Sequence, residues 1–498
     1  MYINNKILIG KNEEKELSIQ LDKANRHGLI TGASGSGKTI TLKVMAESFS
    51  NAGVPVFLAD VKGDIAGTAL IGETNESLEK RLEKLNIENF EYQKFPVRFW
   101  DIFGVSGHPI RTTLNEVGPD ILSMMLGLSE AQSGVLTIVY KIAEDNNWKL
   151  DDIKDLRLLL QYVGDNKNDF ITKYGNITTQ TIGVIQRCLL ALENQGANKF
   201  FGLPELDIND FIQTENGLGM INILDAVELF KSPDLYASFL LWLLTNLFNK
   251  MPEVGDLEKP KIVFFFDEAH LLFNGMPSYR LKQITQVVKL IRSRGIGLYF
   301  ISQSPTDIPD EIIAQLGNRV QHTLRAYTPA EQRTVKVAAD AFRTNPKFNT
   351  TEAILSLGTG EALISFQNEN GEPEIVEKAT ILPPQSKMGT IDEITRNKII
   401  NSSPIVGKYE ETEERESAYE ELNEMIKQKI EEEQQIKQQE LEEKEKLKKQ
   451  KEEEKAKKEA EKERKNSIGY KIGKKVANKT LDKAINKGLN SIFKSIFK

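Results

Sequence analysis

The chain has 498 residues, 40% of them hydrophobic and 28% charged, which is enough for a sizeable core and for roughly two or three domains. Its 65 basic and 72 acidic residues give a net charge of −7, which disfavours a surface coated with nucleic acid but allows a local basic channel. One cysteine excludes a disulfide scaffold, and four scattered histidines disfavour a zinc enzyme. We find no apolar run of about 18 residues and no signal-peptide pattern, so we expect a cytoplasmic protein.

Before about residue 405, short apolar runs alternate with helical patterns, which is typical of crossover units on a mostly parallel sheet. The strand candidates are 27–31, 54–59, 97–100, 219–223, 262–266, 297–301 and 319–324. The helix candidates are 39–50, 113–144, 232–250, 279–294 and 329–339. Residues 361–382 resemble a terminal hairpin. The sequence thus predicts an α/β domain over residues 1–395 with a helical insertion at about 105–215.

A phosphate-binding motif follows the first strand candidate. Residues 32–39 read GASGSGKT and match G-x-x-x-x-G-K-[ST] at every position. The glycines let backbone N–H groups approach phosphate oxygens, Lys38 would reach the β- and γ-phosphates, and Thr39 would offer a hydroxyl to Mg²⁺. A chance glycine-rich turn is the alternative, which the flanking strand and helix disfavour. The residues expected to bind ATP are Gly32, Ala33, Ser34, Gly35, Ser36, Gly37, Lys38, Thr39 and Ile40.

A second motif places two carboxylates directly after the apolar strand 262–266. As in a Walker B element, Asp267 would hold Mg²⁺ and Glu268 would polarise the attacking water as general base. The alternative is an Asp-Glu pair that only caps the next helix, because carboxylates favour helix N-termini. The phosphate-binding motif earlier in the chain favours the catalytic interpretation.

The strand candidate 297–301 is followed by the polar residues Ser302, Gln303 and Ser304. In NTPases that have an additional strand beside the Walker B strand, Gln303 would reach the γ-phosphate or the lytic water as a sensor. The alternative is a solvated loop glutamine.

Four arginines are candidates for a finger that acts on a neighbouring subunit's nucleotide. Arg292 and Arg294 close a helix, where positive charge suits the helix C-terminus, and Arg319 and Arg325 lie on or beside the next strand. We favour Arg319 as the finger. A structural ion pair is the alternative for each of the four.

Five segments together resemble the HerA-like ATPases of the HerA/FtsK superfamily, and most of all its bacterial branch of largely unknown function: HGLITGASGSGKT, VFLADVKGDIAG, FFFDEAH, IRSRGIGLYFISQSPTDIP and LGNRVQHTLRAYTPAEQ. The resemblance spans about residues 1–390. It implies a RecA-like P-loop fold and a homohexameric ring with ATP and Mg²⁺ bound between subunits. In relatives, such a ring pumps double-stranded DNA through its channel.

By this match, Lys38 and Thr39 belong to Walker A, Asp267 and Glu268 to Walker B, and Gln303 is the sensor. The match leaves open the role of residues 60, 62 and 64, which follow the second strand at the same sheet edge. Only 31 residues precede the motif, fewer than the N-terminal β-barrel of archaeal HerA needs, which puts recruitment of a nuclease partner in doubt. An ATP-driven switch or scaffold that remodels a protein complex without DNA is the alternative function.

The C-terminal part changes in composition. Residues 396–409 resemble a linker, and residues 410–465 interleave Glu and Lys at spacings that support a solvated helical arm or a short coiled coil. A disordered charged linker is the alternative to the arm. Residues 466–498 form a basic amphipathic pattern that would suit an anionic membrane, DNA or a partner protein, or simple packing on the body.

Overall fold

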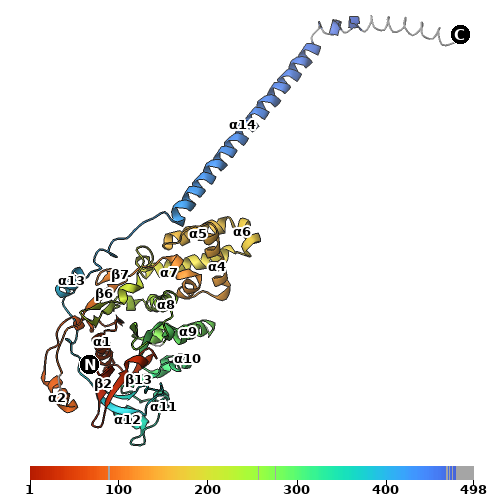
Figure 1. The fold of residues 1–498 in the computed structure, drawn as a ribbon. Helices are drawn as coiled ribbons and strands as arrows, with labels where there is room; N and C mark the ends of the chain where they lie inside the picture. Colours follow the sequence, from red (N-terminus) through yellow and green to blue (C-terminus); the bar gives the residue numbers. More distant parts are fainter. Residues whose placement is uncertain are drawn as a thin grey trace. The chain divides into compact units, whose positions relative to one another are not determined.

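The computed structural model describes residues 1–498 apart from 88–89, 256, 275, 277, 467–468, 470, 474 and 478–498. The chain forms two compact units, Met1–Glu421 and Leu422–Lys498. The first is an α/β body built on one large sheet (Figure 1), which confirms the predicted fold class. Most of the predicted basic tail lies outside the described residues. Among the residues described, no helix is long and apolar enough to cross a membrane.

Parallel strands form the centre of the sheet, and each matches a predicted apolar run to within a few residues. Their order is β13-β4-β12-β11-β5-β10-β6. Their bounds are Asn318–Gln321 for β13, Gly28–Thr31 for β4, Ile296–Ser302 for β12, Ile262–Phe266 for β11, Val56–Asp60 for β5, Ile221–Asp225 for β10 and Val97–Asp101 for β6. Strand β12 therefore lies between the P-loop strand β4 and the acidic strand β11, as an additional-strand NTPase requires.

Antiparallel strands extend the sheet on the β13 side. The predicted hairpin is present as β14 (Glu361–Ser365) and β15 (Glu377–Ile381). Next to it lie strands that the sequence did not predict: β1 (Tyr2–Ile3), β2 (Lys6–Lys11) and β3 (Glu16–Gln20). The short strand β7 (His108–Pro109) borders β6, and β8 (Thr214–Glu215) pairs with β9 (Leu218–Gly219).

Aromatic residues on both faces of the sheet fill the core. On one face, Phe49 of α1 (Lys38–Asn51) packs against Phe265 and Tyr299. On the other face, Phe57 and Phe264 pack against each other, and Phe57 also against a phenylalanine that ends the 3₁₀ turn Ile208–Phe211. Successive strand residues point to opposite faces, so strands buried on both faces are nearly all apolar, as in β11.

Helices cover the sheet, and α4 to α7, within the segment 105–215 that we call the insertion, lie together in Figure 1. The insertion comprises α3 (Leu114–Met125), α4 (Glu130–Asp145), α5 (Ile153–Asp165), α6 (Lys167–Tyr174) and α7 (Thr179–Asn194). The remaining helices of the body are α2 (Glu76–Leu85), α8 (Pro233–Lys250), α9 (Ser278–Leu290), α10 (Asp310–Ile313), α11 (Pro329–Asp340), α12 (Thr350–Ser356) and α13 (Glu393–Asn401). The pattern at 113–144 is not one helix, because Gly127 turns the chain at φ 60° and Ser129 caps a new helix.

The predicted linker at 396–409 differs from what the structure contains. Residues up to 401 belong to α13, whose Arg396 lies 2.9 Å from Asp225, and Tyr409 is fully buried against Trp100. Residues 410–417, predicted as the start of the arm, are not helical. The arm itself is the helix α14 (Ala418–Asn466), which confirms the long charged helix.

We expect Phe49→Ala to lower the free energy of unfolding by about 3–5 kcal/mol, because it empties a fully buried site between two rings. Val105→Ala, at a position that is 80% exposed, should change it by no more than about 0.5 kcal/mol. Urea unfolding of the full chain measures both. Equal midpoints for the two variants would contradict this packing.

Candidate nucleotide-binding site

The register of the parallel strands brings the sequence motifs to one edge of the sheet. Ser302 pairs with Thr31. The P-loop, which follows Thr31, and Gln303, which follows Ser302, therefore leave the sheet at the same position along the strands. The pairing of β11 with β12, and of β5 with β11, continues this level to Asp267 and then to Asp60. Carboxyl ends of parallel strands form the usual ligand edge of an open α/β sheet.

The P-loop leaves β4 and wraps back to the N-terminus of α1. Gly32, Gly35 and Gly37 have φ values of 154°, 77° and 113°, in the region that favours glycine. A Cβ on Gly32 would lie 2.5 Å from the Cβ of His322, whereas a Cβ on Gly35 would meet nothing within 4 Å. The loop is therefore packed closely at its base and open at its tip.

Lys38 turns its ammonium group back onto its own loop. Its Nζ donates to the carbonyl oxygens of Gly32 at 2.5 Å and Ala33 at 3.2 Å. Burial lowers the pKa of Lys38, and the carboxylate of Glu268 is the strongest charge opposing that shift. The P-loop lysine and the acidic pair thus lie within electrostatic reach of each other.

In the acidic pair, Glu268 is buried and Asp267 is half-buried, and hydrogen bonds constrain both residues. Burial, followed by the charge of Glu268, raises the pKa of Asp267 to about 6. The N–H of Glu268 donates to Oδ1 of Asp267 at 2.9 Å, and the hydroxyl of Tyr236 donates to the Asp267 carbonyl at 2.7 Å. Glu268 has a φ of 49°, an uncommon conformation for a residue that carries a side chain. Such outliers are frequent at functional sites.

The donor set of this edge fits a magnesium-bound nucleoside triphosphate. Within the described part of the chain, Oε2 of Glu268 and Oγ of Ser36 are buried without a hydrogen-bond partner. Nδ1 of His270 lies 3.4 Å from Oε2. Buried polar atoms without partners carry a cost of desolvation that a bound ligand or water can relieve. The half-buried hydroxyl of Thr39 directly follows Lys38.

The predicted sensor lies at the same edge. Gln303 directly follows β12 and is exposed. Asp307 fixes its loop, because the Ser302 hydroxyl donates to Oδ2 of Asp307 at 2.7 Å and the Ser304 N–H donates to it at 2.9 Å. The charge of Asp307 also acts on Lys38.

Arg319 does not fit the predicted role of a finger. Its guanidinium donates to the carbonyls of Leu316 at 3.1 Å, Ile313 at 3.2 Å and Ala341 at 2.7 Å, all in its own chain. Three of the donors of this guanidinium are thus bound within the chain. These bonds are to backbone carbonyls and not to a carboxylate, so they are not the structural ion pair that was the alternative.

His322 is a part of the site that the sequence did not single out. Its Nε2 pairs with the hydroxyl of Thr41 at 2.8 Å and its Nδ1 with the carbonyl of Glu361 at 3.0 Å, directly below the P-loop. Burial lowers its pKa to about 4. No spacing or motif marks this histidine, because its partners are distant in the chain.

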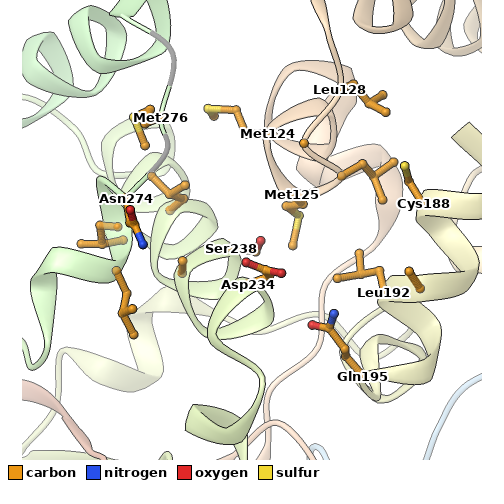
Figure 2. Close-up of a pocket in the computed structure, with 17 residues that line it drawn as sticks. Met124, Met125, Leu128, Cys188, Leu192, Gln195, Asp234, Ser238, Asn274 and Met276 are labelled. Atoms are coloured by element: carbon orange, nitrogen blue, oxygen red, sulfur yellow. The ribbon is translucent and has the colours of Figure 1, made fainter. Parts of the chain in front are cut away.

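A cavity of about 390 Å³ lies apart from the P-loop, between α3, α7, α8 and the segment after the acidic pair (Figure 2). Its walls combine polar and apolar surface, the apolar part including Met124, Met125 and Leu128. Asp234 and Ser238 of α8 line it, and Tyr236 of the same helix holds the Asp267 carbonyl. The cavity contains no P-loop residue, so it is not the nucleotide pocket.

A P-loop, an additional strand and an acidic strand in this order define a RecA-like P-loop NTPase. The chain belongs to the HerA-like C-terminal helicase family, whose profile matches residues 5–498. It is similar to the DNA double-strand break repair helicase HerA of Sulfolobus acidocaldarius, with 24% identity over 72% of this chain and 65% of the relative. The HerA of Pyrococcus furiosus is 23% identical over 72% of this chain and 66% of the relative. The chain thus spans about two thirds of these relatives.

Solved structures with a similar course of the chain include VirB4 of Thermoanaerobacter pseudethanolicus, with a TM-score of 0.48 and 15% identity over 77% of this chain and 97% of that chain. The plasmid coupling protein TrwB in complex with ADP and Mg²⁺ has a TM-score of 0.46 and 13% identity over 74% of this chain and 87% of that chain. At these scores neither structure bears on the residues of the site.

We expect the buried, neutral His322 to make the fold acid-sensitive. Below pH 6.5 the unfolded chain takes up a proton that folded His322 accepts only near pH 4, so stability falls as the pH drops through this window. Between about pH 7.5 and about pH 5, His322 accounts for a loss of about 2 kcal/mol. His322→Gln should show a correspondingly smaller loss in urea unfolding at the two pH values. An equal loss in the variant and wild type would contradict the assignment.

Proposed function

We propose that this chain is an ATP-hydrolysing ring motor of the HerA type that translocates double-stranded DNA. One observation carries the ATPase part: Lys38, Asp267 and Glu268 meet at one edge of the sheet, close enough for their charges to act on one another. Membership of a helicase family supports the motor part. The printed function of the HerA relatives supports DNA as the substrate.

The P-loop would bind the phosphates. The backbone N–H groups at the N-terminus of α1 would donate to phosphate oxygens, and Lys38 would exchange its two carbonyl partners for phosphate oxygens. Thr39 and Asp267 would hold Mg²⁺. When bound, the ion would neutralise charge on the β- and γ-phosphate oxygens. Ser36, whose hydroxyl is buried and unpaired in the described structure, is a further donor for the phosphates.

Glu268 would act as the general base. Its backbone conformation and the bond from its N–H to Asp267 hold it at the edge, and its buried Oε2 has an open acceptor position for a water proton. Gln303, on the neighbouring strand end, would orient the same water or contact the γ-phosphate. The ring would supply a finger arginine from the adjacent subunit, and a hexamer is the assembly we propose.

We expect Glu268→Gln to bind ATP as wild type does and to hydrolyse it at least about 100-fold more slowly, because an amide cannot accept the water proton. Lys38→Ala should instead lose binding, because the loop loses its only mobile cation. Nucleotide titration and steady-state phosphate release separate the two effects. Hydrolysis by Glu268→Gln at the wild-type rate would remove Glu268 from the mechanism.

We also expect linear duplex DNA to stimulate ATP hydrolysis, and the stimulation to fall steeply with salt because phosphate contacts release counterions. The Glu268→Gln variant, with DNA and salt varied in the same way, is the matched control for any phosphate released by a contaminant. Hydrolysis that ignores DNA, together with nucleotide-dependent capture of a protein partner, would replace the DNA motor by the protein-remodelling scaffold.

A further inference from the structure

The turn after β5 lies beside the proposed site and has no role in the function described above. Asp60 ends β5, and the register of β5 with β11 places it next to Asp267. Its carboxylate accepts the backbone N–H groups of Gly63 at 2.8 Å, Asp64 at 3.2 Å and Ile65 at 3.0 Å. Asp60 is therefore occupied as the cap of a tight turn, which Gly63 completes with a φ of 74°.

Lys62 occupies the tip of this turn. Its side chain is exposed, and within the described residues no carboxylate lies within 4.0 Å of its ammonium group. The turn holds the backbone of Lys62 in place, while its ammonium group has no carboxylate partner in the described part of the chain. Such a lysine is well suited to bind an anionic ligand.

The surroundings of Lys62 identify where that anion would lie. Burial and Glu268 raise the pKa of Asp267, and the charges of Lys62 and Lys38 oppose them. Burial also lowers the pKa of Lys38; among the charges, Glu268 raises it and Lys62 lowers it further. Two lysines therefore converge on the same acidic pair from different strands.

The order of the strands separates the two lysines. Lys38 comes from the loop after β4 and Lys62 from the turn after β5, with β12 and β11 between them. Three strand intervals correspond to about 14 Å at the backbone. A nucleotide whose β-phosphate lies in the P-loop extends only its terminal phosphate towards the acidic strand and the β5 turn.

We propose that Lys62 is a second phosphate-binding cation, which contacts the γ-phosphate across the acidic pair and makes the site prefer a nucleoside triphosphate to a diphosphate. This inference rests on the proposed function, since it needs a nucleotide in the P-loop. The Asp60 turn sets the position of Lys62, and Lys38 binds the phosphates nearer the loop.

The test compares binding of ADP and of a non-hydrolysable ATP analogue, each with Mg²⁺, to the full chain by calorimetric titration. Lys62→Ala should weaken binding of the ATP analogue about tenfold or more, as expected for one charge-assisted hydrogen bond, and leave ADP binding within about twofold. Lys62→Arg should recover most of the loss. Lys80→Ala, at an exposed lysine of α2 that pairs with Glu76, is the matched control and should bind both nucleotides as wild type does.

The possible outcomes separate the two hypotheses. If wild type binds neither nucleotide, the proposed function fails. If wild type binds both and Lys62→Ala does the same, or loses affinity for ADP and the ATP analogue equally, the inference fails while the proposed function stands. An unchanged urea midpoint for Lys62→Ala would show that its effect is not a loss of folding.

Discussion

The site depends on parallel strands that end at the same level. The pairings of β4, β12, β11 and β5 leave no freedom in where their loops begin, because a slip in register would turn each strand's side chains to the opposite face. These strands are buried on both faces by phenylalanine and aliphatic side chains, so the register is strongly specified. Packing in the core thereby positions charged groups that lie outside it.

Bringing these charged groups together at one edge of the sheet is unfavourable in free energy. Glu268 is buried and Asp267 half-buried, and burying carboxylates is unfavourable unless cations or hydrogen bonds compensate. Lys38 and Lys62 compensate in part, and a triphosphate with its metal ion would rebalance the whole cluster. The unfavourable burial of these charges thus lies at this edge of the sheet, and the packed core of the sheet supplies the stability. This division is usual for functional sites on rigid folds.

Motifs and apolar runs predicted the centre of this molecule well. The P-loop, the acidic pair and the seven parallel strands carry strong local signals. The strand β2 did not, because KILIGK is short and contains no motif, and its burial depends on pairing with β1, β3 and β15. His322 and Tyr409 were missed for a common reason. Their partners are distant in the chain, and only the fold brings them together.

The segment before α14 is tied to the helical insertion at several points. Arg415 holds Asp151 at 2.6 Å, Glu414 meets Lys154 at 2.6 Å, and Ser417 donates to Asp155. These three ties join residues 414–417 to the start of α5, and earlier in the same segment Glu410 lies 2.6 Å from His108 of β7. The chain of the first unit is therefore held by side-chain contacts as far as Ser417, the residue directly before α14 begins.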